Sequence, residues 1–318
     1  MSLTTVFLGT PEAAVPALEA LLDSDHRVVA VATAPDRPRG RGMELAASPV
    51  KQRAVAAGIP VLQPPTLRTP EAQAELAAAG ADVFVVCAYG LILPPAVLEE
   101  PRLGCVNVHF SLLPAFRGAA PVAGAILAGA GVSGVTIMQM DPGLDTGPIL
   151  DAVEEPIRPD DDTGSLEARL ALAGAGLLVS VLDRLEAGTV EARPQDGSQA
   201  SYAGKVTPED ARIDWAEPSA SIVDRVRAFS PRPGAWTTLD GRRLKVWRAR
   251  TGEGRLAAEP ELEPESEPGS FCSGPGGSLV VATGDGSLVL EEVQPEGGRR
   301  MPGPDFLRGR RGAPGKLS

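Results

Sequence analysis

Short, unbroken apolar runs alternate with Ala- and Leu-rich segments in the first half of this chain, and this alternation restricts the folds that it can adopt. Strands are expected within residues 5–11, 28–33, 82–89, 106–110 and 134–140, and helices at 13–22, 49–57, 70–79 and 166–187. Thr10 and Thr163 stand where they can cap the first and last helix. Strands that are apolar on both faces are typical of a parallel sheet covered by helices on each side. We therefore predict an α/β chain with an N-terminal Rossmann-like, doubly wound, mostly parallel sheet, whose ligands bind beyond the carboxyl ends of its strands.

The strand expected at 106–110 carries two residue types that the chain almost never uses. Asn107 is the only asparagine, and His109 is one of two histidines. Side chains two positions apart share one face of a strand, so the amide and the imidazole point the same way. A polar strand end satisfied by local hydrogen bonds is the alternative explanation. The occurrence of both rare residues on one strand face favours a functional site.

Asp145 extends this pair. It lies in an Asp-Thr-Gly sequence after the last predicted strand, and such a sequence on its own indicates a turn. A reaction that depends on histidine must use His109 or His26, and His26 lies in the polar link 24–27, where a surface position is expected. We therefore take Asn107, His109 and Asp145 as the candidate catalytic group.

The character of the sequence changes after Lys205, so two domains are predicted, at 1–205 and 206–318. A helix is expected at 219–229, and strands at 235–239, 243–249, 278–283 and 287–293. Short strands joined by Gly-containing turns predict a small antiparallel β-barrel of the OB-like kind. An acidic insert at about 253–277 is expected to be a flexible loop, and the last dozen residues a loose tail.

Composition argues against several classes of protein. No stretch approaches the roughly 20 apolar residues of a membrane span, and the first residues lack a secretory signal, so a cytoplasmic protein without a membrane partner is expected. The three cysteines are widely spaced without a C-x-x-C sequence, and no metal site is predicted. The net charge of −11 disfavours a nucleic-acid partner. However, six of the 17 acidic residues in 206–318 lie in 253–267, and the rest of that part is locally basic.

Two segments resemble the signature regions of the methionyl-tRNA formyltransferase family. They are Asn107–Pro121, which contains Ser-Leu-Leu-Pro, and 134–147, which ends in Asp-Thr-Gly. Further similar segments are 7–11, 35–42, 48–51, 88–94 and 211–215. The N-terminal segments are shared in part with other enzymes that use 10-formyltetrahydrofolate. The two-domain length and the segment 211–215 favour the tRNA enzyme.

The resemblance implies an enzyme that transfers a formyl group from 10-formyltetrahydrofolate to the α-amino group of methionine on initiator methionyl-tRNA, and a monomer is expected. Asn107 and a protonated His109 would stabilise the developing oxyanion, and ionised Asp145 would favour the imidazolium. The folate contacts implied by the resemblance are Tyr89, Gly90, Leu91, Leu93, Ser111, Leu112, Leu113, Pro114, Gln139 and Asp141.

The resemblance also implies tRNA contacts in the loop 36–45, at Arg37, Arg39 and above all Arg41. Met43 and Glu44 depart from the family pattern, which favours lysines there, and Ala115 stands where an arginine is frequent. In the C-terminal domain, Arg243 and Lys245 share a strand face and are further tRNA candidates. The alternatives are an ordinary solvated loop for the three arginines and an ordinary solvated face for Arg243 and Lys245.

Two other functions remain open. The same site could formylate a small amine, such as a glycinamide nucleotide or an amino sugar, although the second domain and the basic loop argue against this. A nucleotide-binding protein would show the same alternation of strands and helices, but the first turn lacks G-x-G-x-x-G.

Overall fold

The computed structural model describes residues 2–39, 44–251 and 266–318, which form two compact units. The first comprises the chain up to Pro121 together with Val132–Pro156 and Glu167–Gly204. The second comprises Val122–Gly131, Ile157–Leu166 and Lys205–Ser318. Each unit is described by itself.

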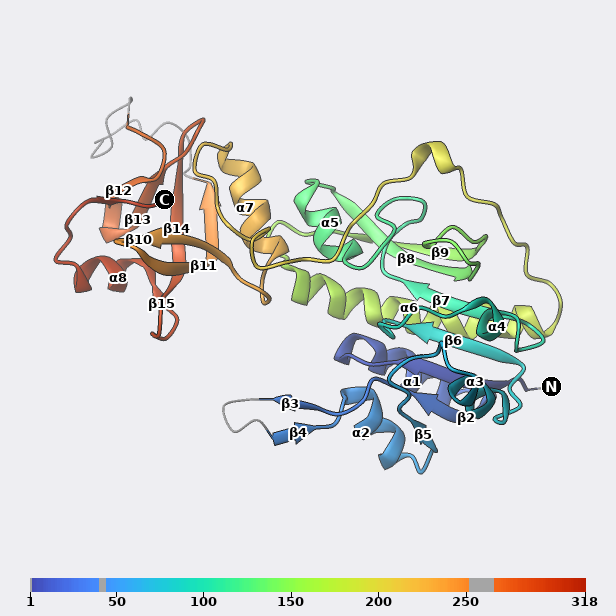
Figure 1. The fold of residues 1–318 in the computed structure, drawn as a ribbon. Helices are drawn as coiled ribbons and strands as arrows, with labels where there is room; N and C mark the ends of the chain where they lie inside the picture. The colour runs from blue at the N-terminus through green and yellow to red at the C-terminus, as the bar shows by residue number, and fades with distance from the viewer. Residues whose placement is uncertain (1, 40–43, 252–265) are drawn as a thin grey trace. The chain divides into compact units, whose positions relative to one another are not determined.

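The first unit is built on a seven-stranded sheet with the order β5-β2-β1-β6-β7-β8-β9 (Figure 1). Its strands are β1 Thr4–Gly9, β2 Arg27–Ala32, β5 Val61–Leu62, β6 Val83–Cys87, β7 Cys105–His109, β8 Val132–Gln139 and β9 Ile149–Pro156. The strands from β5 to β7 are parallel, whereas β8 and β9 each pair antiparallel with the preceding strand of that order. The predicted Rossmann-like, mostly parallel sheet is confirmed, with an antiparallel edge that the sequence did not indicate.

Helices cover both faces of this sheet. They are the short 3-10 helix η1 Glu12–Ala14, α1 Val15–Leu22, α2 Pro49–Ala56, α3 Pro70–Ala77, α4 Pro95–Leu98 and α6 Thr163–Glu186. Apolar residues of α3 and α4 form one core cluster with alternate residues of β1 and β6, among them Leu8 and Phe84. On the other face, Gly174 of α6 approaches Val108 and Val135 so closely that a Cβ would stand 3.0 Å from each.

Within the described residues, α6 is long and apolar enough to cross a membrane, so the prediction that no stretch approaches a membrane span was wrong by length and composition. Its apolar side is used within the fold, because Leu170, Leu178 and Leu182 are fully buried. The helix is therefore a core helix of this unit.

Local capping differs from the prediction at both predicted threonine caps. The residue at the N-cap of η1 is Pro11, and the Thr10 hydroxyl instead donates to the carbonyl oxygen of Tyr89 at 3.0 Å. At the start of α6, the Asp162 carboxylate accepts the Ser165 N–H at 2.8 Å, whereas the Thr163 hydroxyl donates to a carbonyl outside the helix. Asp162 therefore has the capping role that was assigned to Thr163.

His26 is buried rather than on the surface. Only 5% of the residue is exposed, Nδ1 accepts the N–H of Leu3 at 3.3 Å, and Nε2 lies 3.3 Å from the Asp183 carboxylate of α6. The polar sequence around it suggested exposure, but contacts with distant segments bury it.

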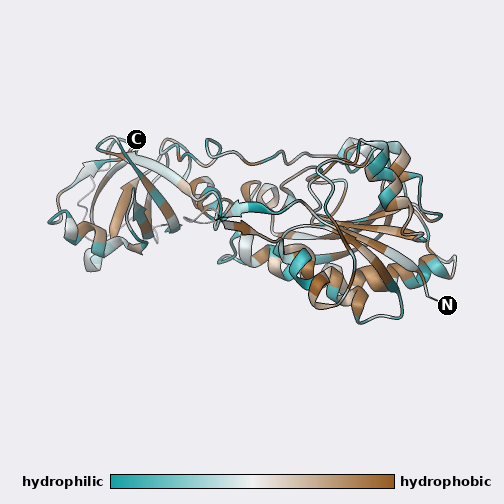
Figure 2. Ribbon diagram, turned by 60° about the horizontal axis from the view of Figure 1, so that its bottom comes forward, coloured by the Kyte–Doolittle hydropathy of each residue, from teal (hydrophilic) through white to brown (hydrophobic). Residues whose placement is uncertain are grey.

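The second unit contains an antiparallel sheet with the order β10-β11-β14-β13-β12-β16, and β15 pairs with β14. The strands are β10 Ala235–Leu239, β11 Arg242–Thr251, β12 Ser270–Ser273, β13 Leu279–Ala282, β14 Ser287–Pro295, β15 Met301–Pro302 and β16 Gly315–Lys316; the helices are α5 Pro121–Leu127, α7 Ser219–Ala228 and α8 Gly303–Gly309. Its core includes Trp215, Ile222, Phe271 and Leu290. Figure 2 shows the apolar strands of the two sheets in brown. The predicted antiparallel, barrel-like second sheet is confirmed.

Two segments that were predicted to lack order are part of this sheet. The flexible acidic insert was predicted to end at about 277. However, Ser270–Ser273 form β12, and Phe271 is buried. The expected loose tail contains the end of α8 and all of β16, and Leu317 is 2% exposed. Large apolar side chains of both segments, Phe271 in the first and Leu307 and Leu317 in the second, are buried in the core of this unit. Residues 253–265 of the predicted insert lie outside the described residues.

Candidate functional site

The alternation of side chains along β7 separates the packing residues from the polar ones. Val108 contacts α6, so Asn107 and His109, at the neighbouring positions, point to the opposite face. Asn107 is half-buried, and within the described part of the chain no side-chain hydrogen bond of its amide is found. Its donor and acceptor atoms are therefore available to a bound molecule.

Asp145 reaches this face from the loop that follows the antiparallel strand β8. Its carboxylate Oδ2 lies 3.9 Å from Nδ1 of His109 and accepts the backbone N–H of Gly118 at 2.8 Å. Asp145 has a φ of +53°, which is uncommon for a residue other than glycine. The structure therefore brings His109 and Asp145 together and puts Asn107 on the same strand face as the histidine.

Burial controls the protonation of His109, which is 5% exposed. Loss of solvent lowers the pKa of His109, and the charge of Asp145 and the hydrogen bond to Phe116 oppose this effect only in part. Nε2 lies 3.1 Å from the carbonyl oxygen of Phe116, so it carries a proton and donates. The free protein therefore favours a neutral imidazole, in contrast to the protonated form that was assumed from the sequence.

Two residues beside this group, Arg117 and Gln195, were not predicted from the sequence. Arg117 is buried, and both its Nε and Nη2 donate to the side-chain oxygen of Gln195. The Gln195 amide donates in turn to the carbonyl oxygens of Asp145 and Gly147. Arg117 lay inside a recognised segment, but Gln195 stands in a polar stretch whose pattern gives no signal.

Comparisons with known proteins identify the family of this chain. Residues 3–182 match the family described as formyl transferase, and residues 205–311 match the formyl transferase C-terminal domain. A methionyl-tRNA formyltransferase of Thiobacillus denitrificans is 52% identical over 305 residues, which cover 96% of each chain. One from Stutzerimonas stutzeri is 51% identical over 309 residues, covering 97% of this chain and 95% of that protein. The chain belongs to the methionyl-tRNA formyltransferase family.

A solved structure shares the fold. HypX from Aquifex aeolicus in complex with tetrahydrofolic acid superposes with a TM-score of 0.65 at 16% identity, over 96% of this chain and 47% of HypX. The chain spans about half the length of HypX, and at this identity the likeness concerns the fold alone.

Most side chains expected to contact folate in this family member are engaged within the protein. Ser111 donates to the carbonyl oxygen of Ala115, Gln139 donates to two backbone carbonyls, and Asp141 accepts from Thr146. Tyr89, Leu93 and Leu113 are buried, whereas Gly90, Leu91, Leu112 and Pro114 are at least partly exposed. Any folate contact along these loops therefore depends on backbone groups and apolar surface.

The two ends of the predicted tRNA loop pair as antiparallel strands, β3 Arg37–Arg39 and β4 Glu44–Ala46, and form a hairpin. At its base the Lys51 ammonium lies 2.6 Å from the Asp36 carboxylate, and hydrogen bonds from Lys51 and then Gln63 lower the pKa of Asp36. Arg37 is exposed. Arg41 lies outside the described residues, and so does the side chain of Arg39.

In the second unit, Arg243 and Lys245 lie on a face that also holds two tryptophans. The Arg243 guanidinium lies 4.1 Å from the ring centre of Trp236, and the Arg300 guanidinium lies 3.6 Å from that of Trp247. Burial, and next the charges of Arg243 and Arg300, lower the pKa of Lys245. The three basic groups therefore share one positive patch, and Arg300 was not among the predicted residues.

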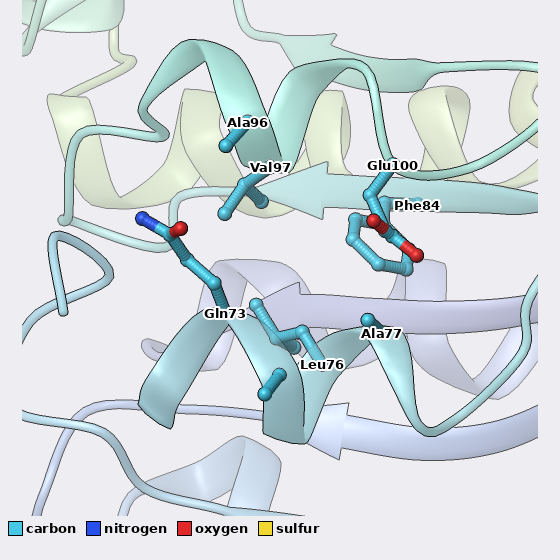
Figure 3. Close-up of a pocket in the computed structure, with 8 residues that line it drawn as sticks. Gln73, Leu76, Ala77, Phe84, Ala96, Val97 and Glu100 are labelled. Carbon is cyan, nitrogen blue, oxygen red and sulfur yellow. The ribbon is translucent and has the colours of Figure 1, made fainter. Parts of the chain in front are cut away.

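Two cavities lie apart from the candidate catalytic group. One of about 190 Å³ lies between α3 and α4, where Leu76, Phe84 and Val97 line it together with Gln73 and Glu100 (Figure 3). One of about 490 Å³ in the second unit is lined by ion-paired residues such as Arg227, Arg250 and Glu291. Across residues 2–39, 44–251 and 266–318, no group of three or more possible metal-ligating side chains occurs.

Proposed function

We propose that this protein transfers the formyl group of 10-formyltetrahydrofolate to the α-amino group of methionine on initiator methionyl-tRNA. The observation that carries this proposal is the juxtaposition of Asn107, His109 and Asp145 in a member of this family. We further propose that it works as a monomer in the cytoplasm without a metal ion, with residues 1–205 as the catalytic part and 206–318 as a tRNA-binding part.

The residues around the candidate group fit a folate co-substrate. The Asn107 amide is available as a hydrogen-bonding group, and Ile92 and Leu144, in the loops after β6 and β8, are 75% and 59% exposed. Exposed apolar side chains beside free polar groups suit a ligand with an aromatic ring system and a polar edge. When bound, the folate would supply an activated formyl carbon, which accepts the amine as its bond to the folate nitrogen breaks.

Asn107 has the clearest role in this reaction. Attack by the amine develops negative charge on the formyl oxygen, and the side-chain amide of Asn107 can donate a hydrogen bond to it. Because this amide has no competing hydrogen bond to a described residue, it needs no rearrangement to do so.

His109 and Asp145 are proposed to move the proton. Nδ1 of the neutral imidazole can accept the proton that the attacking amine loses, since Nε2 is already engaged with Phe116. The Asp145 carboxylate, 3.9 Å from Nδ1, stabilises the resulting imidazolium. The same nitrogen can then return the proton to the departing folate nitrogen, which leaves His109 neutral for the next turnover.

Two surfaces are proposed to hold the tRNA: the hairpin with Arg37, Arg39 and Arg41, and the patch with Arg243 and Lys245. Arginines on the hairpin can reach phosphates, and guanidinium groups stacked on tryptophan rings present a rigid cationic surface. The Lys51–Asp36 pair supports the base of the hairpin.

The test is incubation with 10-formyltetrahydrofolate and either charged initiator tRNA, glycinamide ribonucleotide or a nucleotide-linked amino sugar. Formylmethionine is expected on the tRNA, with turnover of the small amines at least about 100-fold lower in kcat/KM. His109→Ala protein, in which formylation should be strongly reduced, is the control. Preferential formylation of a small amine would contradict the proposal.

A further inference from the structure

Residues 193–204, called the strap here, follow α6 and pair with two segments next to the candidate catalytic residues. At one end, Arg193 and Ile149 exchange two backbone hydrogen bonds of 2.8 Å. At the other end, the N–H of Arg117 donates to Ser201 and the N–H of Ala203 donates to Arg117, each at 2.8 Å. The strap is therefore fixed to the start of β9 and to the segment after β7.

The Gln195 side chain uses its whole carboxamide in this arrangement. Its nitrogen donates to the carbonyl oxygens of Asp145 at 2.8 Å and Gly147 at 2.7 Å. Its oxygen accepts two hydrogen bonds from Arg117, at 3.1 and 2.7 Å. A carboxylate or an apolar group of the same length could not replace both functions, because only an amide donates twice and accepts.

The Gln195 side chain contacts the backbone of Asp145, which has a left-handed conformation. A φ of +53° costs energy for a residue with a side chain and persists only when its surroundings fix it. Gln195 fixes the carbonyl of Asp145 itself, and the Gly118 N–H fixes its carboxylate. The direction of the carboxylate toward His109 therefore depends on the strap.

Ser201 supports His109 in the same way. Its hydroxyl oxygen accepts the N–H of Phe116 at 2.9 Å, and Phe116 also has a left-handed φ, of +57°. The carbonyl of Phe116 accepts the proton on Nε2 of His109. The strap also crowds this segment, because a Cβ on Gly118 would stand 2.6 Å from the Ala203 carbonyl oxygen.

We propose that Gln195 and Ser201 are positioning residues, which orient Asp145 and His109 through hydrogen bonds from one strap. The inference rests on the proposed function. The proposal also gives a role to the buried Arg117, whose guanidinium holds the neutral side chain of Gln195.

The test begins with Gln195→Met, which keeps the length of the side chain and removes the amide. A fall in kcat of about 10- to 100-fold is expected, because small displacements of catalytic groups have effects of this size. The KM values for folate and tRNA should stay within about twofold, since the Gln195 carboxamide is engaged with Arg117, Asp145 and Gly147. Gln199→Ala is the matched control, because Gln199 lies on the same strap and, among the described residues, its side chain hydrogen-bonds only Asp196.

A spectroscopic readout separates positioning from general damage. The chain has two histidines, so their ring resonances can be assigned with a His109→Gln variant. In Gln195→Met protein the titration midpoint of His109 should move to lower pH, because the carboxylate that favours its charged form is displaced, and the His26 resonances should be unchanged. This readout needs no activity. If the wild-type protein formylates no tRNA but Gln195→Met still shifts the His109 titration midpoint, the proposed function is wrong and the positioning role of the strap stands.

Two further variants complete the test. Ser201→Ala should lower kcat and Ser201→Thr should restore it, because threonine keeps the hydroxyl; this pair also serves if Gln195→Met fails to fold. In an Asp145→Ala background, Gln195→Met should reduce the remaining rate by less than about twofold. An unchanged kcat and His109 signal in both Gln195→Met and Ser201→Ala, or an undiminished effect without Asp145, would overturn the proposal.

Discussion

At the scale of single residues, the site depends on a histidine that burial keeps neutral. Loss of solvent lowers the pKa of His109 in the folded protein below its ordinary value of 6.5, so the unfolded chain binds this proton more readily. The contribution of His109 to the free energy of unfolding is therefore complete above pH 6.5 and is lost as the pH falls toward the lowered pKa.

The lowered pKa of His109 gives the first prediction, which compares the wild-type and His109→Gln proteins. The unfolding free energy of wild type should fall more steeply than that of the variant as the pH is lowered below about 6.5, as measured by denaturant titration. The kcat/KM of wild type should decline as the pH falls through the lowered pKa of His109, because the proton acceptor is lost there. A rate that rises in acid would mean that the imidazolium is the active form.

Tyr89 gives a second prediction at this scale. Its hydroxyl is buried without a hydrogen-bond partner in the described part of the chain, and burial raises the pKa of Tyr89 to about 12. Tyr89→Phe should therefore leave the free energy of unfolding unchanged or raise it by up to about 1 kcal/mol. Folate KM should not change, because the Tyr89 side chain packs in the buried core. A clear loss of folate affinity would show that the hydroxyl reaches the ligand.

At the scale of elements, β11 carries a matched pair of arginines with different surroundings. Arg243 stacks on Trp236 in the positive patch, whereas Arg248 lies 3.9 Å from the Glu291 carboxylate and is 68% exposed. An arginine already paired with an acid contributes less to phosphate binding. The two positions therefore separate a tRNA surface from an ordinary solvated strand face.

Arg243→Ala should raise the KM for methionyl-tRNA and reduce the slope of log affinity against log salt by about 1, which corresponds to one lost phosphate contact. Arg248→Ala should change neither value. The measurements are tRNA binding at several salt concentrations and steady-state formylation. Equal effects of the two substitutions would remove the patch as a specific tRNA surface.

At the scale of the whole molecule, the second unit includes a segment from earlier in the chain. The Arg227 guanidinium donates to the carbonyls of Arg158 and Asp161 at 3.2 Å each, and Thr163 and Ser230 add hydrogen bonds of 2.6 and 2.9 Å between Ile157–Leu166 and the rest of the unit. A protein cut near residue 205 therefore loses part of this unit.

The fragment 205–318 should be less stable than the same unit in the full chain, by about 2–4 kcal/mol if each lost hydrogen bond contributes about 1 kcal/mol. The three tryptophans, Trp215, Trp236 and Trp247, all lie in this fragment, so tryptophan fluorescence reports its unfolding in either protein. Denaturation curves of the two proteins should differ in midpoint. Equal midpoints would mean that 157–166 contributes nothing to the second unit.

The sequence by itself determined the elements whose pattern is local. Apolar runs predicted β1, β2, β6 and β7 within a few residues, since a strand buried on both faces needs no partner to be recognised. The rarity of Asn107 and His109 indicated the candidate group, and the resemblance of its flanking segments indicated the family that the comparisons confirm.

Only the tertiary structure decided what depends on contacts between distant residues. The antiparallel direction of β8, the burial of His26, and the pairing of β12 and β16 follow from which segments meet, and a local pattern does not encode this. The same holds for Gln195, whose neighbours in sequence are exposed while its amide fixes a loop 50 residues away. The protonation of His109 belongs here too, because desolvation is a property of the packed site and not of the sequence around it.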